Sequence, residues 1–256
     1  MESRDPQGTT VKAVERAMTV IEAVREADGG RVTALAEELG LAKSTVHGYL
    51  STLHELGYLT KEDDVYYVGA KFLRLGEYSR TRRPEYVMAA EKVTELAAAT
   101  DERAQFVIEE HGRGAFLYRE SGSHAVETDS EAGKRMYLHT TSAGKCILAH
   151  LPDERVEAII DRWGLPAMTP NTITDREAMV EELAAIRERG YAYNRAENIE
   201  GLHAVGVPLT TRQHGVVGAL SISGPSHRMK GDWFERELPD RLLGTANELE
   251  LNIAYA

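Results

Sequence analysis

Residues 32–60 read VTALAEELGLAKSTVHGYLSTLHELGYLT, and this stretch decides the fold of the first third of the chain. A short helical pattern, which Thr33 can cap, ends at Gly40, and a second helical run follows a sharp turn. The apolar residues of the second run recur at helical spacing and are expected to share one face: Val46, Leu50, Leu53 and Leu56. The opposite face is rich in hydroxyl groups, which suits either DNA reading or an ordinary solvated surface.

The flanking sequence extends this pattern on both sides. Upstream, apolar residues recur at helical spacing until Asp28-Gly29-Gly30 stops the helix: Val14, Ala17, Met18, Ile21 and Val24. Downstream, Gly57 closes the helical run, and LTKEDDVYYVG at residues 59–69 predicts a β-hairpin with an acidic tip. Helix, helix, turn, helix and two-stranded wing is the order of a winged helix-turn-helix.

The second helical run carries the candidate DNA contacts. Its first turn holds Lys43, Ser44 and Thr45, where backbone amides and hydroxyl groups suit phosphate oxygens. Four further residues are predicted to face base edges: His47, Gly48, Ser51 and Thr52. Lys61 is the one cation of the wing, beside three acidic residues. The alternative, a surface helix of an unrelated helical bundle, stays open.

The rest of the chain predicts a second, α+β domain. AKFLRLGEYSRTRR, at residues 70–83, reads as a connecting helix whose end is marked by Pro84. Strands are predicted in RAQFVIEEHGRGAFLYRES with a turn at Gly112-Arg113-Gly114, and in LHAVGVPLTT and GVVGALSIS; a capping box at residues 174–177 opens a helix that ends at Gly190. The expected divisions are a DNA-binding domain at 1–69, a linker helix at 70–84 and an antiparallel sheet with helices at 85–256.

Composition limits the classes of protein. The 256 residues carry a formal net charge of −11, and residues 1–83 have 12 Lys and Arg against 13 Asp and Glu, so most of the acidity lies in the second domain. An acidic surface with few lysines suggests a high-salt cytoplasm. One cysteine, a polar start without a leader and no long apolar run predict a cytoplasmic protein that does not span a membrane.

Several chemical motifs are weak or absent. The run YLHTTSAGKCILAHLP fails as a phosphate loop, because His139 stands where glycine is required and Cys146 where Ser or Thr should hold a metal. A catalytic pair of Cys146 with His139 or His150 is disfavoured, since a lone cysteine on an apolar helix face is usually core. The nine histidines show no metal-ligand spacing. We therefore expect no catalytic residue, no metal and no cofactor.

Five ordered blocks together resemble the IclR family of transcriptional regulators over almost the whole chain. They are VKAVERAMTVIEAV, VTALAEELGLAKSTVHGYLSTLHELGYL, YLHTTSAGKCILAHLP, GYAYNRAENIEGLHAVGVPL and VVGALSISGP. The resemblance implies a winged helix-turn-helix, a linker helix and a GAF-like effector-binding domain, in a homodimer or a dimer of dimers. It also implies that a small organic acid, aromatic acid or sugar derivative alters binding to double-stranded operator DNA.

The resemblance also places an effector pocket on six residues of this chain: Ala143, Gly144, Asn194, Ala204, Ser221 and Ser223. Ser221 and Ser223 already share one strand face by alternation. The chain departs from many relatives, which have Asp in place of Asn194, Cys or Ser in place of Ala204 and Arg in place of Gly48. A less acidic pocket beside Arg195 favours an anion. The rival function is a metabolite-binding or enzymatic domain with an N-terminal module for protein contacts.

Overall fold

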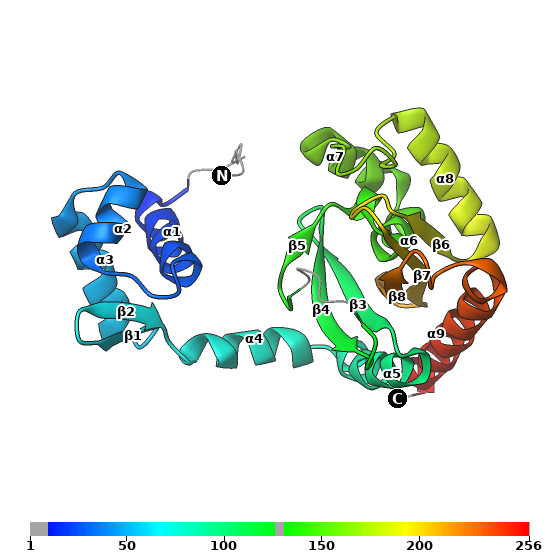
Figure 1. Ribbon diagram of the computed structural model, residues 1–256, viewed down its shortest axis with the longest axis horizontal. Helices are drawn as coiled ribbons and strands as arrows, with labels where there is room; N and C mark the ends of the chain where they lie inside the picture. Colours follow the sequence, from blue (N-terminus) through cyan, green and yellow to red (C-terminus); the bar gives the residue numbers. More distant parts are fainter. Residues whose placement is uncertain (1–9, 126–130, 256) are drawn as a thin grey trace. The chain divides into compact units, whose positions relative to one another are not determined.

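The computed structural model describes residues 10–125 and 131–255, so the polar start of the chain lies outside the described residues (Figure 1). Contacts within the chain divide it into one compact unit that ends at Ser79 and a second that begins at Arg80. Each unit has its own hydrophobic core. Across the described ranges, no helix is both long and apolar enough to cross a membrane.

The first unit is the predicted winged helix-turn-helix. Its elements are α1 (Lys12–Glu26), α2 (Val32–Leu39), α3 (Lys43–Glu55), the antiparallel strands β1 (Leu59–Glu62) and β2 (Val65–Val68), and the start of α4 (Lys71–Thr81). The three helices and the hairpin enclose one apolar cluster, to which α3 contributes its inner face: Val46, Leu50 and Leu53. Gly40 and Gly57 both have the left-handed backbone that was expected at a helix end, with φ of 63° and 75°.

Two local predictions in this unit were wrong. Leu56 does not join the buried face of α3 and is 55% exposed, because the helix ends at Glu55 and Leu56 is its C-cap. Thr33 does not cap α2, because the helix already begins at Val32 and its N-cap is Arg31, which makes no capping bond through its side chain. Neither change alters the order of elements.

The second unit is built on a six-stranded antiparallel sheet with strand order β5-β4-β3-β8-β7-β6. The strands are β3 (Arg103–Glu110), β4 (Arg113–Ser121), β5 (Arg135–Met136), β6 (Ala192–Arg195), β7 (Leu202–Thr211) and β8 (Gly215–Pro225). The helices are α5 (Pro84–Thr100), a 3-10 turn at Leu138–Thr140, α6 (Ser142–His150), α7 (Asp153–Trp163), α8 (Arg176–Arg189), a π-helical turn at Trp233–Glu237 and α9 (Leu238–Tyr255). This is the predicted α+β architecture.

Helices cover both faces of this sheet (Figure 1). α5 and α9 pack on one face against a cluster that includes Phe106, whereas α6, α7 and α8 cover the other with a cluster that includes Val107. Neighbouring residues of β3 thus belong to opposite layers, as alternation along a strand requires. α6 is buried from Ser142 to Ala149, which places its N-terminus deep in the domain.

Three boundaries in this unit also differ from the sequence-based prediction. Pro84 is the first residue of α5 rather than the marker of the linker's end, because α4 already stops at Thr81. The turn between β3 and β4 lies at residues 111–112, since Arg113 pairs with Glu110. The cap of α8 is Asp175, whose carboxylate accepts from the amide of Ala178, and not the preceding threonine.

Candidate functional site

The outer face of α3 presents the predicted DNA-reading residues. Five of them are exposed, Lys43, Ser44, His47, Gly48 and Thr52, whereas Thr45 and Ser51 are half-buried. The N-cap, Ala42, provides no side-chain bond to the first turn, so the first amides of α3 are available to an anion. On the wing, Lys61 is exposed and its Nζ lies 5.3 Å from the ring centroid of Tyr66. The geometry is compatible with DNA contact, and the contacts themselves stay predictions.

Gly48 stands on this face without a steric reason. Apart from its chain neighbours and the backbone of its own helical turns, a Cβ added at this position would meet no described atom within 4 Å. Glycine in the interior of a helix costs roughly 0.5–1 kcal/mol relative to alanine. The structure gives no account of the glycine, and the position has room for a larger side chain.

Strand pairing brings the predicted pocket residues of the second unit together. Asn194 on β6 pairs with Ala204 on β7, which pairs with Ser223 on β8. Ser221 lies two residues before Ser223 on the same face of β8, and it pairs with Gln105 of β3. These residues line one cavity of about 310 Å³, which Ala143 of α6 also lines. Five of the six predicted pocket residues therefore share a cavity.

Gly144 does not line this cavity, because it seats α6 against the preceding turn. A Cβ on Gly144 would lie 2.2 Å from the carbonyl oxygen of Leu138, and its amide donates to Oγ1 of Thr141 over 3.0 Å. A second glycine acts from the sheet, since a Cβ on Gly206 would lie 2.8 Å from the amide nitrogen of Ala143. The two glycines let the N-terminus of α6 approach β7 closely enough to wall the cavity.

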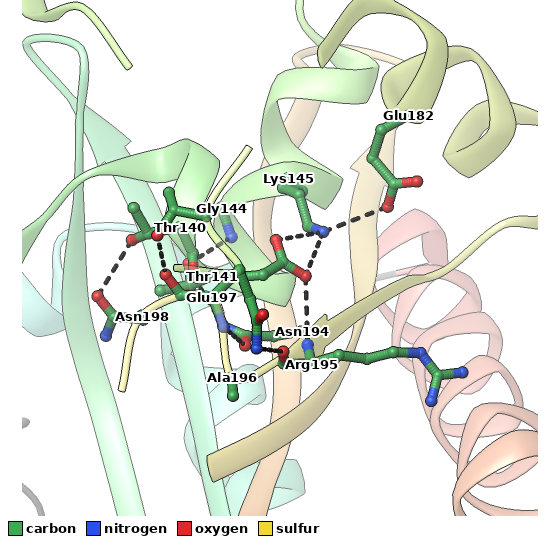
Figure 2. A network of polar contacts seen from close by, with 12 residues as sticks. Thr140, Thr141, Gly144, Lys145, Glu182, Asn194, Arg195, Ala196, Glu197 and Asn198 are labelled. Atoms are coloured by element: carbon green, nitrogen blue, oxygen red, sulfur yellow. Dashed lines mark hydrogen bonds and ion pairs between the residues drawn. The ribbon is translucent and has the colours of Figure 1, made fainter. Parts of the chain in front are cut away.

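The polar side chains at the floor of the cavity are not equivalent. Oγ of Ser221 donates to Oε1 of Gln105 over 3.2 Å. Oγ of Ser223 is buried and has no hydrogen-bond partner within the described part of the chain. Asn194 is already bonded on both sides of its amide, because its Nδ2 donates to the carbonyl of Thr140 over 2.7 Å and its Oδ1 accepts from the amide of Glu197 over 2.9 Å (Figure 2). Ser223 is therefore the group that a ligand can satisfy at no cost to existing bonds.

Three cationic side chains line the cavity: Arg113, Lys134 and Arg135. None of its described lining residues is acidic. The guanidinium carbon of Arg113 lies 3.9 Å from the ring centroid of Tyr137, and Nε donates to the carbonyl of Met136 over 3.0 Å. Arg113 is held as a buried cation at one side of the cavity. An anion is the ligand charge that this lining favours.

Arg195 was expected to meet that anion, and the structure contradicts this. Its guanidinium carbon lies 4.6 Å from the ring centroid of Tyr193 and 5.0 Å from that of Phe234. Because Asn194 points into the cavity, the next residue of β6 must point to the opposite side of the sheet. The cations that line the cavity, Arg113, Lys134 and Arg135, were not predicted as pocket residues.

Cys146 is core, as the sequence predicted. The side chain is fully buried, and Sγ donates to the carbonyl of Gly206 over 3.1 Å. Burial raises the pKa of the Cys146 thiol to about 12. His139 and His150 each make a contact to a backbone carbonyl, of Pro166 and of Cys146 respectively. Within the described ranges, no group of three His, Cys, Asp or Glu side chains is placed to hold a metal ion.

Two protein-family models match this chain, one in each unit. Residues 13–63 match the IclR helix-turn-helix domain, and residues 86–251 match the bacterial transcriptional regulator IclR C-terminal domain. The chain belongs to the IclR family. The probable HTH-type transcriptional regulator ArcR of Halobacterium salinarum is 34% identical over 96% of this chain and 95% of its own length.

Solved structures agree with this assignment to the IclR family. The IclR of Thermotoga maritima matches with a TM-score of 0.80 at 27% identity, over 94% of this chain and 98% of that one. The PobR inducer-binding domain from Acinetobacter, as a double mutant in complex with 3-hydroxybenzoic acid, matches with a TM-score of 0.59 at 27% identity, over 64% and 96% of the two chains. The chain is thus a DNA-binding transcriptional regulator with an effector domain, and these relatives are regulators rather than enzymes.

Proposed function

We propose that this chain binds a two-fold operator as a dimer through the outer face of α3, and that a small organic anion in the cavity of the second unit changes that binding. No catalytic step and no cofactor is part of this function. The observation that carries the proposal is the cavity itself. It combines the unpartnered hydroxyl of Ser223 with buried Arg113, and its described lining holds no carboxylate.

The size and lining of the cavity favour a small effector. A volume of about 310 Å³ is at the lower end of the range for ligand pockets, roughly 300–1,000 Å³. Aromatic hydroxy acids are one class to test, because the PobR domain is in complex with 3-hydroxybenzoic acid. Aliphatic carboxylates and sugar acids are the others, since they carry the same anionic group. A GAF-like sheet with a largely preformed cavity fits this role.

A dimer is favoured by the apolar surface of the first unit. Val11, Val14 and Met18 form one stripe on α1 and its N-terminal flank, with exposed fractions of 64%, 61% and 47%. Such a stripe on a small domain is typical of an interaction surface. Two copies supply two recognition helices to a two-fold operator, which compensates for the low positive charge of each copy. Pairing of dimers into a tetramer is the alternative assembly.

The surroundings in which the protein works follow from its charge. A net charge of −11 with 8 Lys suits a concentrated salt solution that screens self-repulsion. The relative from Halobacterium salinarum supports this inference. We place the protein in the cytoplasm, where the chromosome is.

One titration tests the proposed function. Fluorescence anisotropy would follow binding to labelled DNA from the region upstream of the chain's own coding sequence, with a shuffled duplex as control. Benzoate, 3-hydroxybenzoate, succinate and gluconate would be added at constant ionic strength, and the control variant Ser223→Leu fills the cavity. We expect preference for the upstream DNA and a response to at least one anion that Ser223→Leu removes. Equal binding to the shuffled duplex would instead favour the rival function, a metabolite-binding or enzymatic domain.

A further inference from the structure

A buried ion pair lies beside the cavity without lining it. Nζ of Lys145, a residue that is 2% exposed, lies 2.9 Å from Oε1 and 2.7 Å from Oε2 of Glu197 (Figure 2). The same ammonium group is 3.3 Å from Oε1 of Glu182, which also accepts from Arg189 over 2.9 Å. Two cations and two carboxylates thus form a neutral group between α6, α8 and the segment that follows β6.

Stability alone is a weak reason for this pair. Removing two charges from water is costly, and replacing a buried ion pair by apolar residues of similar volume is often neutral or stabilising. Lys145 lies in the buried part of α6 next to the core residues Cys146 and Ile147, where methionine would fill the same space. The charges therefore need another role, and the contacts of Glu197 indicate one.

Glu197 belongs to a tight turn that forms one wall of the cavity. Ala196 has a left-handed backbone, with φ of 62°. The amide of Glu197 donates to Oδ1 of Asn194 over 2.9 Å, and its carboxylate accepts from the amide of Arg195 over 3.2 Å. Asn194 and Asn198, on either side of the turn, both line the cavity.

The turn is joined to α6 at two places. Thr140, just before α6, accepts from Nδ2 of Asn194 through its carbonyl and donates through Oγ1 to Oδ1 of Asn198, over 2.7 Å and 3.2 Å. The ion pair from Lys145 is the second connection, on the side of the turn away from Thr140 (Figure 2). Charge-assisted bonds are directional and strong in a buried site. The pair can therefore hold Ala196 in the left-handed backbone conformation, which alanine does not favour.

We propose that Lys145 and Glu197 are positioning residues, which hold the turn at 194–198 in place so that the wall of the cavity exists before any effector arrives. The proposal rests on the proposed function in one respect, namely that an effector contacts this wall of the cavity. The position of the wall itself can be measured without a ligand.

Native-state hydrogen exchange on the full-length protein tests this. The variants are Lys145→Met, Glu197→Met and the double variant, which keeps the volume and removes both charges. The matched control is Lys92→Met with Glu248→Met, which removes an ion pair of 2.9 Å between α5 and α9 on the other face of the sheet. The informative amides are those of Ala196 and Glu197, because their acceptors, the carbonyl of Leu202 and Oδ1 of Asn194, are unchanged in every variant.

We expect exchange at Ala196 and Glu197 to accelerate by at least about tenfold in the double variant, while amides in the ladder of β3 with β4 keep their parental rates. The control pair should leave both sets unchanged. The double variant also guards against a single variant that fails to fold, since it leaves no unpaired buried charge. Unchanged exchange at the two turn amides, or acceleration shared equally by the β3–β4 ladder, overturns the proposal. Failure of the DNA titration would leave this result standing.

Discussion

Oγ of Ser221 donates to Oε1 of Gln105 over 3.2 Å, across the pairing of β8 with β3. Two residues along the same strand, the hydroxyl of Ser223 is buried without a partner among the residues that the structure describes. Two serines that look identical in the sequence are therefore in different states. One is part of the floor of the cavity, and the other is available to a ligand.

Ser223→Ala and Ser221→Ala should accordingly have different effects. Ser223→Ala removes an unsatisfied buried hydroxyl, so the free energy of unfolding should stay the same or rise, while the response to an effector falls. Ser221→Ala leaves Oε1 of Gln105 without its donor and should lower the free energy of unfolding by about 1 kcal/mol. Urea denaturation and anisotropy with the responding anion measure the two quantities. Equal loss of stability in both variants would contradict the unequal roles.

The stability of the second unit should decrease in mild acid because of His139. This side chain is 3% exposed, and burial lowers its pKa below the ordinary value of 6.5, with further lowering by Lys145 and Arg113. In the window below 6.5 and above the folded-state pKa, the unfolded chain binds the proton and the folded chain does not, so the free energy of unfolding falls as pH falls. Above that window, the contribution of His139 is constant.

His139→Gln isolates this effect, with His47→Gln on the exposed face of α3 as the matched control. Urea denaturation at a series of pH values below 7 should give a shallower pH dependence for His139→Gln than for the parent, and no change for the control. A profile of His139→Gln that parallels the parent would show that the acid sensitivity has another origin.

Much of the fold could be predicted from the sequence because the signals are local. Helix periodicity, the glycines at positions 40 and 57 and strand alternation define the order of elements without any long-range contact. The bond between Gln105 and Ser221 could not be predicted in this way. Gln105 is the one polar residue of the run AQFVI at 104–108, but its partner Ser221 lies 116 residues away, and only the strand order β4-β3-β8 brings them together.

The candidate site shows the same limit. The family resemblance placed Asn194 and Ser223 at the cavity, where the structure has them, yet it could not show that Thr140 and Glu197 already occupy the amide of Asn194. The prediction that Arg195 meets the anion was avoidable, since strand alternation puts Arg195 on the opposite side of the sheet from Asn194. Arg113 could not have been found, because its place in the cavity depends on Tyr137 and Met136, on a strand and turn of no clear sequence pattern.

The affinity for DNA should depend only weakly on salt concentration, because few cations are predicted to reach phosphates. Each phosphate that is neutralised contributes a log-log slope of about −0.9. Lys43 and Lys61 are the cations predicted to reach phosphates in each copy, so a dimer should give a slope of about −4. Anisotropy between roughly 0.1 and 1 M potassium chloride gives the slope directly. A value steeper than about −6 would mean that further cations of the chain contact DNA.

Substitutions on α3 should separate phosphate contacts from base contacts. Ser44→Ala should weaken binding to the operator and to a shuffled duplex alike, because it removes a donor to phosphate and carries no sequence information. His47→Ala or Thr52→Ala should instead lower the preference for the operator by roughly 1–3 kcal/mol per lost base contact.

Gly48→Arg should tighten binding to both duplexes, since the position is open and the new cation reaches the same groove. Gly48→Ala is its control, and should raise the free energy of unfolding by roughly 0.5–1 kcal/mol without the gain in affinity. If none of these variants changes the anisotropy titration, α3 is not the element that contacts DNA.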